Sequence, residues 1–304
     1  MARRLGDHSL TAGKLPEIRV QMIQDNEEGE ALGALPSMAA HNAALRNAEL
    51  FFVAGDMFEM VQAASQELKN YTFRTSDLPS EHGLLIWEGS IGTGHVGVSW
   101  SRLGSRVKIT CLMMKADIAA TMIHPVTGVP IKDFKVPGPC PVGQDVSLVL
   151  TENAEIHSDN AFRRNAVIAD RTHARAGGFS SVEMKQMVKL LMTLFLVMRQ
   201  TIVVETPAHT PRGSARWIEK LDPNLLGATR YCTLRHKSMN AERVGTSKDS
   251  GRIFRHRWIS RGHWRDQPYP AKGTVERIWI PLSVKGPAGA PLLDPSKLVN
   301  ILKR

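Results

Sequence analysis

The stretch LLIWEGSIGTGHVGVSWSRLGSRVKITCLMM, residues 84–114, decides the fold class of this chain. Its apolar runs are short and rich in β-branched, aromatic and aliphatic residues, and glycine-bearing turns separate them, which is typical of strands in a meander. The runs span residues 84–87, 95–100, 107–114 and, just beyond the quoted stretch, 118–123. We therefore predict an antiparallel sheet in this part of the chain.

Helical periodicity precedes this predicted sheet. Between residues 38 and 68, apolar side chains recur at three- and four-residue intervals and no proline interrupts them. This spacing favours one long amphipathic helix or two short ones. Gly55 is the expected break between them.

A further predicted helix follows the sheet. Residues 181–205 form the most apolar stretch, with Ser180 or Ser181 placed to cap the helix and Glu183 in its first turn, where the helix dipole favours an acid. The uninterrupted apolar core of this stretch, residues 190–198, is far shorter than the ~20 residues that a bilayer span requires. We expect a buried helix at the centre of the core and no membrane contact.

Together these patterns predict an α+β protein, made of helices and an antiparallel sheet and carrying a basic, β-hairpin-like segment near its C-terminus. We expect a loosely ordered leader at residues 1–35, an α+β core at 36–205, and a basic C-terminal region at 206–304 that packs on the core. One short strand is expected at residues 18–23, and residues 206–229 are expected to be rich in loops.

Length and composition favour a globular protein of the cytoplasm. With 304 residues and 42% hydrophobic content, the chain is long enough to bury a core. Its three cysteines, Cys111, Cys140 and Cys232, fall in no metal-binding spacing and are expected to be reduced thiols. Residues 1–15 lack the apolar segment of a secretory signal. We expect no metal ion and no cofactor.

The net charge of +10 favours polyanions or acidic protein surfaces as partners. The charge is concentrated near the C-terminus, where residues 251–285 hold eight basic and two acidic residues, a net of +6. The basic residues are Arg252, Arg255, Arg257, Arg261, Arg265, Lys272, Arg277 and Lys285. More than half of the excess charge therefore lies in one short segment.

The same segment is rich in aromatic residues. Arginines supply planar forks for phosphate, and aromatic rings offer surfaces on which unpaired bases stack, a combination that single-stranded RNA sites use. We therefore predict a nucleic-acid interface formed by Arg255, Arg257, Arg261, His263, Trp264, Arg265, Tyr269 and Arg277. In an alternative interpretation, the segment is a rigid hairpin of a protein-binding module, in which the tryptophans anchor the core and the arginines stack on them.

Histidines in the basic region provide a second alternative. His236, His256 and His263 lie near arginines, and two histidines beside a cation can cleave RNA by general acid and base catalysis without a metal ion. If the segment is a strand, its period of two places His256 and Trp258 on one face and Arg257 on the other. Spacing along the sequence leaves open whether two imidazoles face one phosphate.

Other motifs give little support to enzyme classes. The glycine-rich run GSIGTG, residues 89–94, lacks the lysine of a P-loop and precedes a predicted strand, so we interpret it as a hairpin turn. The chain contains neither an HExxH zinc motif nor a GxSxG nucleophile motif.

The C-terminal block resembles that of one known family. The matching residues are Arg255, Arg257, Arg261, Gly262, His263 and Trp264, then Tyr269, and finally Arg277 and Trp279. The block is similar to the end of the type V-A anti-CRISPR family whose members lower production of the Cas12a effector: R-x-H-x-R-R-G-H-W, an aromatic-containing turn, then R-x-R-W or an equivalent strand. The chain departs from this pattern at Ile259-Ser260 and at Arg265, which replaces a second histidine.

The resemblance implies a function for the whole protein. It implies a phage- or mobile-element-encoded host-interference regulator in the host bacterial cytoplasm, and a protein that is not an enzyme. Such a regulator binds RNA, or a target associated with the ribosome or the nascent chain, and suppresses expression. A host protein is a further candidate partner.

Overall fold

The structure, a computed structural model, describes residues 10–31, 39–69, 71–73, 75–91, 95–103, 106–114, 141–149, 156–157, 181–235, 255–287 and 290–293. The chain divides into two compact units, Met1–Leu234 and Arg235–Arg304.

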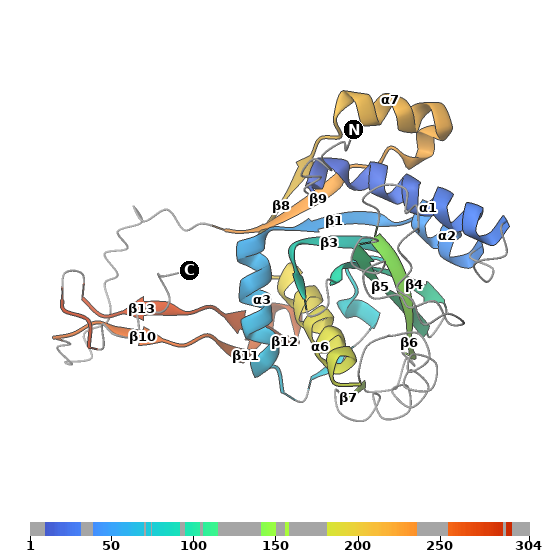
Figure 1. Ribbon diagram of the computed structural model, residues 1–304. Helices are drawn as coiled ribbons and strands as arrows, with labels where there is room; N and C mark the ends of the chain where they lie inside the picture. The colour runs from blue at the N-terminus through green and yellow to red at the C-terminus, as the bar shows by residue number, and fades with distance from the viewer. Residues whose placement is uncertain are drawn as a thin grey trace, which may run out of the picture. The chain divides into compact units, whose positions relative to one another are not determined.

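The first unit is built on a seven-stranded mixed sheet (Figure 1). The strands are β1 (Glu49–Val53), β3 (His82–Ile91), β4 (His95–Leu103), β5 (Arg106–Met114), β6 (Pro141–Val149), β8 (Val203–Ala208) and β9 (Thr229–Leu234). They lie in the order β6-β5-β4-β3-β1-β9-β8. Strand β1 is parallel to both β3 and β9, and all other neighbours in the sheet are antiparallel.

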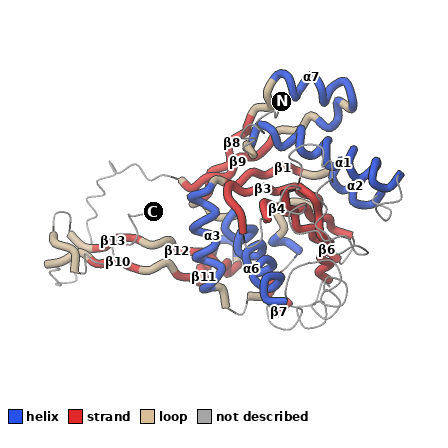
Figure 2. The backbone as a smooth tube through the Cα atoms, viewed as in Figure 1, coloured by secondary structure: helices blue, strands red, loops and turns tan. Residues whose placement is uncertain are grey.

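Helices cover both faces of this sheet. They are α1 (Leu15–Ala31), α2 (Ala39–Arg46), α3 (Gly55–Glu67), α6 (Ser181–Met198) and α7 (Arg212–Leu221). In Figures 1 and 2, α3 and α6 lie on one side of β1 and β3, and α1, α2 and α7 lie on the other. Three 3₁₀ turns, η1 (Ala12–Lys14), η2 (Thr75–Asp77) and η3 (Pro223–Leu225), and a short pair, β2 (Thr72–Phe73) with β7 (Ile156–His157), complete the unit.

Alternation along β1 explains the three layers. Leu50 and Phe52 belong to a buried cluster with residues of α1, α2 and α7. Phe51 faces the other way, with its ring 5.7 Å from that of Trp100, and the Trp100 ring in turn lies 4.9 Å from that of Phe195 on α6. Because successive side chains point to opposite faces of a strand, one central strand anchors both helical layers.

The predicted α+β class, the meander at β3–β5 and the helix beginning at Ser181 are confirmed. The central sheet is mixed rather than wholly antiparallel, because residues 49–53 form a parallel strand inside the region expected to be helical. Gly55 begins a helix instead of separating two. A strand buried on both faces has apolar residues at consecutive positions, which periodicity does not distinguish from a helix.

Two segments differ from their expected structure. Residues 18–23 are helical rather than a strand, and buried residues such as Leu15 and Ile23 tie α1 to the core, within the segment expected as a loose leader. Residues 206–229, expected to be loop-rich, contain α7 and belong to the first unit. The strand expected at 118–123 lies outside the described residues. None of the helices that the structure describes has the length and apolar character of a bilayer span.

The second unit contains a two-stranded antiparallel ribbon. Strand β10 (Trp258–Ser260) pairs with β13 (Ser283–Lys285), and β11 (His263–Tyr269) pairs with β12 (Thr274–Ile280). The turn at the end is η4 (Pro270–Lys272) followed by Gly273, whose φ of 64° is left-handed. This confirms the basic hairpin expected from the sequence.

The two strand pairs of the ribbon share one register. Trp258 lies opposite Lys285, Ser260 opposite Ser283, and His263 opposite Ile280, so no residue is gained or lost across the gap between the pairs. The gap places residues 261–262 opposite residues 281–282. Pro281, which has no amide hydrogen to donate, lies in this gap.

We predict that Gly83→Ala destabilises the first unit by about 3 kcal/mol. A Cβ atom at Gly83 would lie 2.0 Å from Cζ2 of Trp100. The indole cannot move away, because it is 2% exposed, packs against two aromatic rings, and donates from Nε1 to the carbonyl oxygen of Ser80 at 2.9 Å. The urea midpoint should fall. Gly213→Ala is the matched control, since a Cβ atom there meets nothing within 4 Å; an equal midpoint shift in both variants would contradict the prediction.

Candidate nucleic-acid interface

The constant register assigns each ribbon residue to one of two faces. Side chains alternate along a strand and directly opposed residues share a face. One face, which we name the basic face, carries Arg261, His263 and Arg265, opposite the aliphatic row Leu282, Ile280 and Ile278. The other, the aromatic face, carries Trp258, Trp264, Asp266, Arg277 and Trp279.

Two tryptophans anchor the aromatic face. The rings of Trp264 and Trp279, directly opposed across the ribbon, lie 5.5 Å apart at 60°. Trp279 is only 5% exposed, and its ring passes so close to Gly262 that a Cβ atom there would lie 2.3 Å away. Glycine is therefore required by the packing of Trp279, and Trp264 serves the ribbon as a packing residue.

Two of the predicted RNA-binding arginines make internal contacts. Arg277 donates from Nε and Nη2 to the carboxylate of Asp266, the second bond at 2.9 Å. Arg257 donates from Nε to the carbonyl oxygen of Ala290 at 2.8 Å, and its backbone pairs with residues 291 and 293. These guanidinium groups already have acceptors, so they hold the second unit together.

The other predicted cations are exposed. Arg255, Arg261, His263 and Arg265 all lie at the surface. His263 Nδ1 lies 3.1 Å from the carbonyl oxygen of Arg261, and the guanidinium of Arg265 donates to Gln267. Among the described residues, no carboxylate forms an ion pair with any of the four, so the charges of the three arginines are available to a partner.

Tyr269 stands at the far end of the basic face. Its side chain is partly buried, and Nζ of Lys272 lies 5.4 Å from the ring centroid. This cation–π contact occupies one face of the ring and leaves less of it for stacking on a base.

The ribbon does not bring two histidines together. His256 and His263 fall on opposite faces and are separated by roughly 20 Å of extended chain. General acid and base catalysis requires both imidazoles within hydrogen-bond reach of one phosphate group. His236, the third candidate, lies outside the described residues. The described geometry therefore gives no support to a nuclease pair of His256 and His263.

Neither described cysteine has the properties of a nucleophile. Cys111 and Cys232 are buried thiols outside any disulfide. Burial, with Glu205 nearby, raises the pKa of the Cys232 thiol to about 12 against the opposing effect of Arg230. A thiol with such a pKa stays protonated near neutral pH. Cys140 lies outside the described residues.

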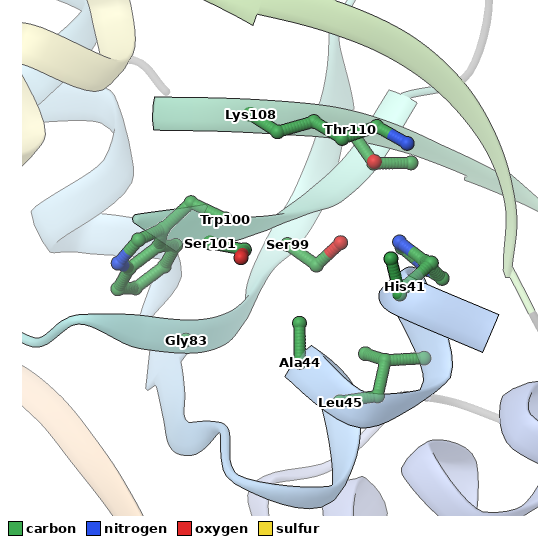
Figure 3. A pocket seen from close by; sticks show the side chains of 10 residues that line it. His41, Ala44, Leu45, Gly83, Ser99, Trp100, Ser101, Lys108 and Thr110 are labelled. Carbon is green, nitrogen blue, oxygen red and sulfur yellow. The ribbon is translucent and has the colours of Figure 1, made fainter. Parts of the chain in front are cut away.

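Sequence reasoning missed a small hollow in the first unit. His41 of α2 faces a row of polar side chains on β4 and β5 (Figure 3): Ser99, Ser101, Lys108 and Thr110. The hollow encloses about 20 Å³, room for about one water molecule rather than a substrate. Polar residues at alternate positions of two buried strands were the signal in the sequence. Among the described residues, no cluster of histidine, cysteine or carboxylate side chains is suited to a metal ion.

The edge where the parallel strands end is occupied by the protein's own carboxylate. Such edges commonly bind anionic ligands at the start of the following helix. Here Glu88 accepts a hydrogen bond from the backbone nitrogen of Gly55 at 3.0 Å, at the start of α3. Burial, with Glu88 and Asp56 nearby, raises the pKa of the adjacent Tyr231. This edge is negatively charged and does not suit a phosphate.

Comparisons with known proteins identify no family. No family model matches the chain and no curated protein matches it. Among solved structures, the crystal structure of AcrVA2 aligns with 89% of this chain and 93% of its own, at 13% sequence identity and a TM-score of 0.35. This likeness is too weak to assign a fold or a function.

We predict that Gly262→Ala loosens the ribbon, because the added methyl group overlaps the Trp279 ring and separates it from Trp264. Hydrogen exchange of the β11 and β12 amides should become at least about tenfold faster, and the near-ultraviolet dichroism of the tryptophans should weaken. Gly273→Asn is the control, since its site is open and asparagine tolerates the left-handed backbone. Unchanged exchange in the Gly262 variant would show that the Trp279 ring does not pack against Gly262.

Proposed function

We propose that this protein is a host-interference regulator that binds RNA, or a ribonucleoprotein, through the basic face of the ribbon. The observation that carries the proposal is the exposed row of Arg261, His263 and Arg265, for which the described residues supply no carboxylate partner. Such a row attracts phosphates electrostatically, and arginine forks bind them with good geometry. The similarity of this block to the end of the type V-A anti-CRISPR family supports a role in suppressing expression from a phage or mobile element.

The structure divides the eight predicted binding residues by their contacts. Arg261 and Arg265 are about 13 Å apart along the strand, so each can bind a different phosphate, and His263 lies between them. Arg255 adds a further exposed charge beyond the ribbon. Arg257 and Arg277 stabilise the second unit and contribute little to the proposed interface. Trp264 and Tyr269 pack within the ribbon, so we assign the binding energy to charge more than to stacking.

An apolar row on the basic face favours a second candidate, a protein partner. Leu282 and Val284 are 45% and 46% exposed, and both share the face of Arg261. A cationic row beside an aliphatic row fits an acidic, amphipathic protein surface. On such a partner, Leu282 and Val284 would contribute to binding, whereas RNA would depend on the arginines alone.

We predict that Arg261→Gln combined with Arg265→Gln weakens binding of the full-length protein to a short, labelled single-stranded RNA about tenfold in dilute buffer. Each lost phosphate contact makes the log–log salt dependence shallower by about 0.7, so the slope should change by about 1.4. Fluorescence anisotropy at several potassium chloride concentrations measures both quantities.

The matched control is Asp266→Asn combined with Arg277→Gln, which removes an internal ion pair without changing the net charge and should leave RNA affinity as it is. A second control, Leu282→Ser with Val284→Ser, should also bind RNA normally. If the arginine variant retains wild-type affinity and slope, RNA binding by this face is refuted. If only the Leu282→Ser, Val284→Ser variant loses a protein partner that the wild type recovers from the host, protein binding replaces RNA binding as the proposed function.

A further inference from the structure

A second basic surface lies on α7 of the first unit. Arg212, Arg216 and Lys220 recur every four residues, so they follow one side of the helix, and all three are exposed. Ile218 points the opposite way and is fully buried in the cluster that α7 shares with α1. Within the part of the chain that the structure describes, no carboxylate forms an ion pair with any of the three cations.

The start of α7 conflicts with the rules of helix stability. Pro211 precedes the helix and supplies no side-chain cap, and the first turn holds no acid. Arg212 instead places a positive charge where the helix dipole is itself positive. The carboxylate of Glu17, which accepts a hydrogen bond from the Ser214 hydroxyl, offsets part of this charge, but no described carboxylate forms an ion pair with Arg212 itself. A local conflict of this kind is typical of a functional surface.

The glycine at position 213 is a second feature of the helix start that stability does not explain. A Cβ atom there would meet nothing within 4 Å, and its φ is not among the positive values of the described glycines. Neither packing nor backbone geometry therefore requires glycine, which disfavours a helix relative to alanine. What glycine does provide, between two exposed cations, is a flat surface that a ligand can approach closely.

Charges around α7 leave the surface positive. Another cation, Lys14, lies close to the start of α7. Its neighbour Gly13 contacts the segment just before the helix, where a Cβ atom at Gly13 would lie 2.7 Å from the carbonyl oxygen of His209. Of the nearby acids, Glu17 accepts a hydrogen bond from the hydroxyl of Ser214, Asp222 at the C-cap forms an ion pair with Arg46, and Glu219 is exposed at the border of the basic row. One exposed carboxylate is thus set against three exposed cations on the helix.

We propose that the basic side of α7 binds the phosphate backbone of single-stranded RNA without reading its sequence. Successive cations stand about 6 Å apart along the helix axis, so each can bind a separate phosphate. The positive dipole at the start of the helix adds to the same attraction. No apolar side chain lies within the row of cations, which favours a polyanion over a protein surface. The inference adds a contact surface to the proposed function and does not depend on the ribbon.

The test uses the full-length protein and the labelled single-stranded RNA described above. Arg216→Gln combined with Lys220→Gln should weaken binding about tenfold in dilute buffer and make the salt slope shallower by about 1.4. Glu219→Gln, on the same helix, should strengthen binding about twofold by removing the one exposed acid. All three side chains are exposed, and unchanged far-ultraviolet dichroism would verify that α7 is intact.

Gly213→Ala tests the helix start separately. It should raise the melting temperature, because the methyl group enters open space and alanine favours the helix. A lower melting temperature would mean that packing requires the glycine, and Gly213 would then no longer support a ligand-binding role for the start of α7.

The ribbon and α7 variants separate the two proposals. If the ribbon double variant loses RNA while the α7 double variant binds as the wild type does, the α7 inference is overturned and the proposed function stands. The reverse pattern supports α7 and overturns the ribbon as the interface. If labelled polyglutamate binds as tightly as RNA and is lost with the α7 variant, an acidic protein rather than nucleic acid is the occupant, and the inference fails.

Discussion

The buried guanidinium of Arg19 joins the three segments on which the parallel centre of the sheet depends. From α1 it donates to the carbonyl oxygen of Ala48, at the entry to β1, at 3.2 Å, and also to the carbonyl oxygen of Leu225 in η3, shortly before β9. Burial lowers its pKa to about 10 against the opposing influence of Asp222. A buried charge is tolerated only where acceptors replace water. The acceptors here are the backbone carbonyl oxygens that precede β1 and β9. Arg19 therefore holds α1, the start of β1 and the segment before β9 in one arrangement.

The presence or absence of a backbone or carboxylate acceptor among the described residues separates two kinds of arginine in this protein. Arg19, Arg257 and Arg277 have internal acceptors, as does Arg199, which donates to the buried carboxylate of Asp77 at 2.6 Å. Arg216, Arg261 and Arg265 are exposed and form no ion pair with the described carboxylates. Net charge in the sequence counts both kinds equally. The geometry shows which guanidinium groups already have hydrogen-bond acceptors within the protein and which are exposed to a polyanion.

Much of the fold could be predicted from local patterns, and the failures have physical causes. The meander from residue 84 and the helix from Ser181 were predictable because alternation, turns and an apolar run agree there. Strand β1 was mistaken for helix because its burial on both faces removes the alternation of a half-exposed strand. Helix α7 was missed because proline and glycine at its start are loop signals, although Ile218 and the spaced cations follow helical periodicity. The basic ribbon was predictable, but the internal pairing of Arg277 with Asp266 required the cross-strand register.

The gap in the ribbon at Pro281 has a mechanical consequence. A two-stranded ladder resists bending through its hydrogen bonds, and the bonds are missing where residues 261–262 lie opposite residues 281–282. The ribbon is therefore two short hydrogen-bonded pieces that share one register and meet at a joint without ladder bonds, where the Trp279 ring packs on Gly262. Arg261 stands at the joint, and His263 and Arg265 stand on the piece beyond it. Curvature at this point would change the spacing of the cations, so the ribbon can conform to a surface without losing a single strand pair.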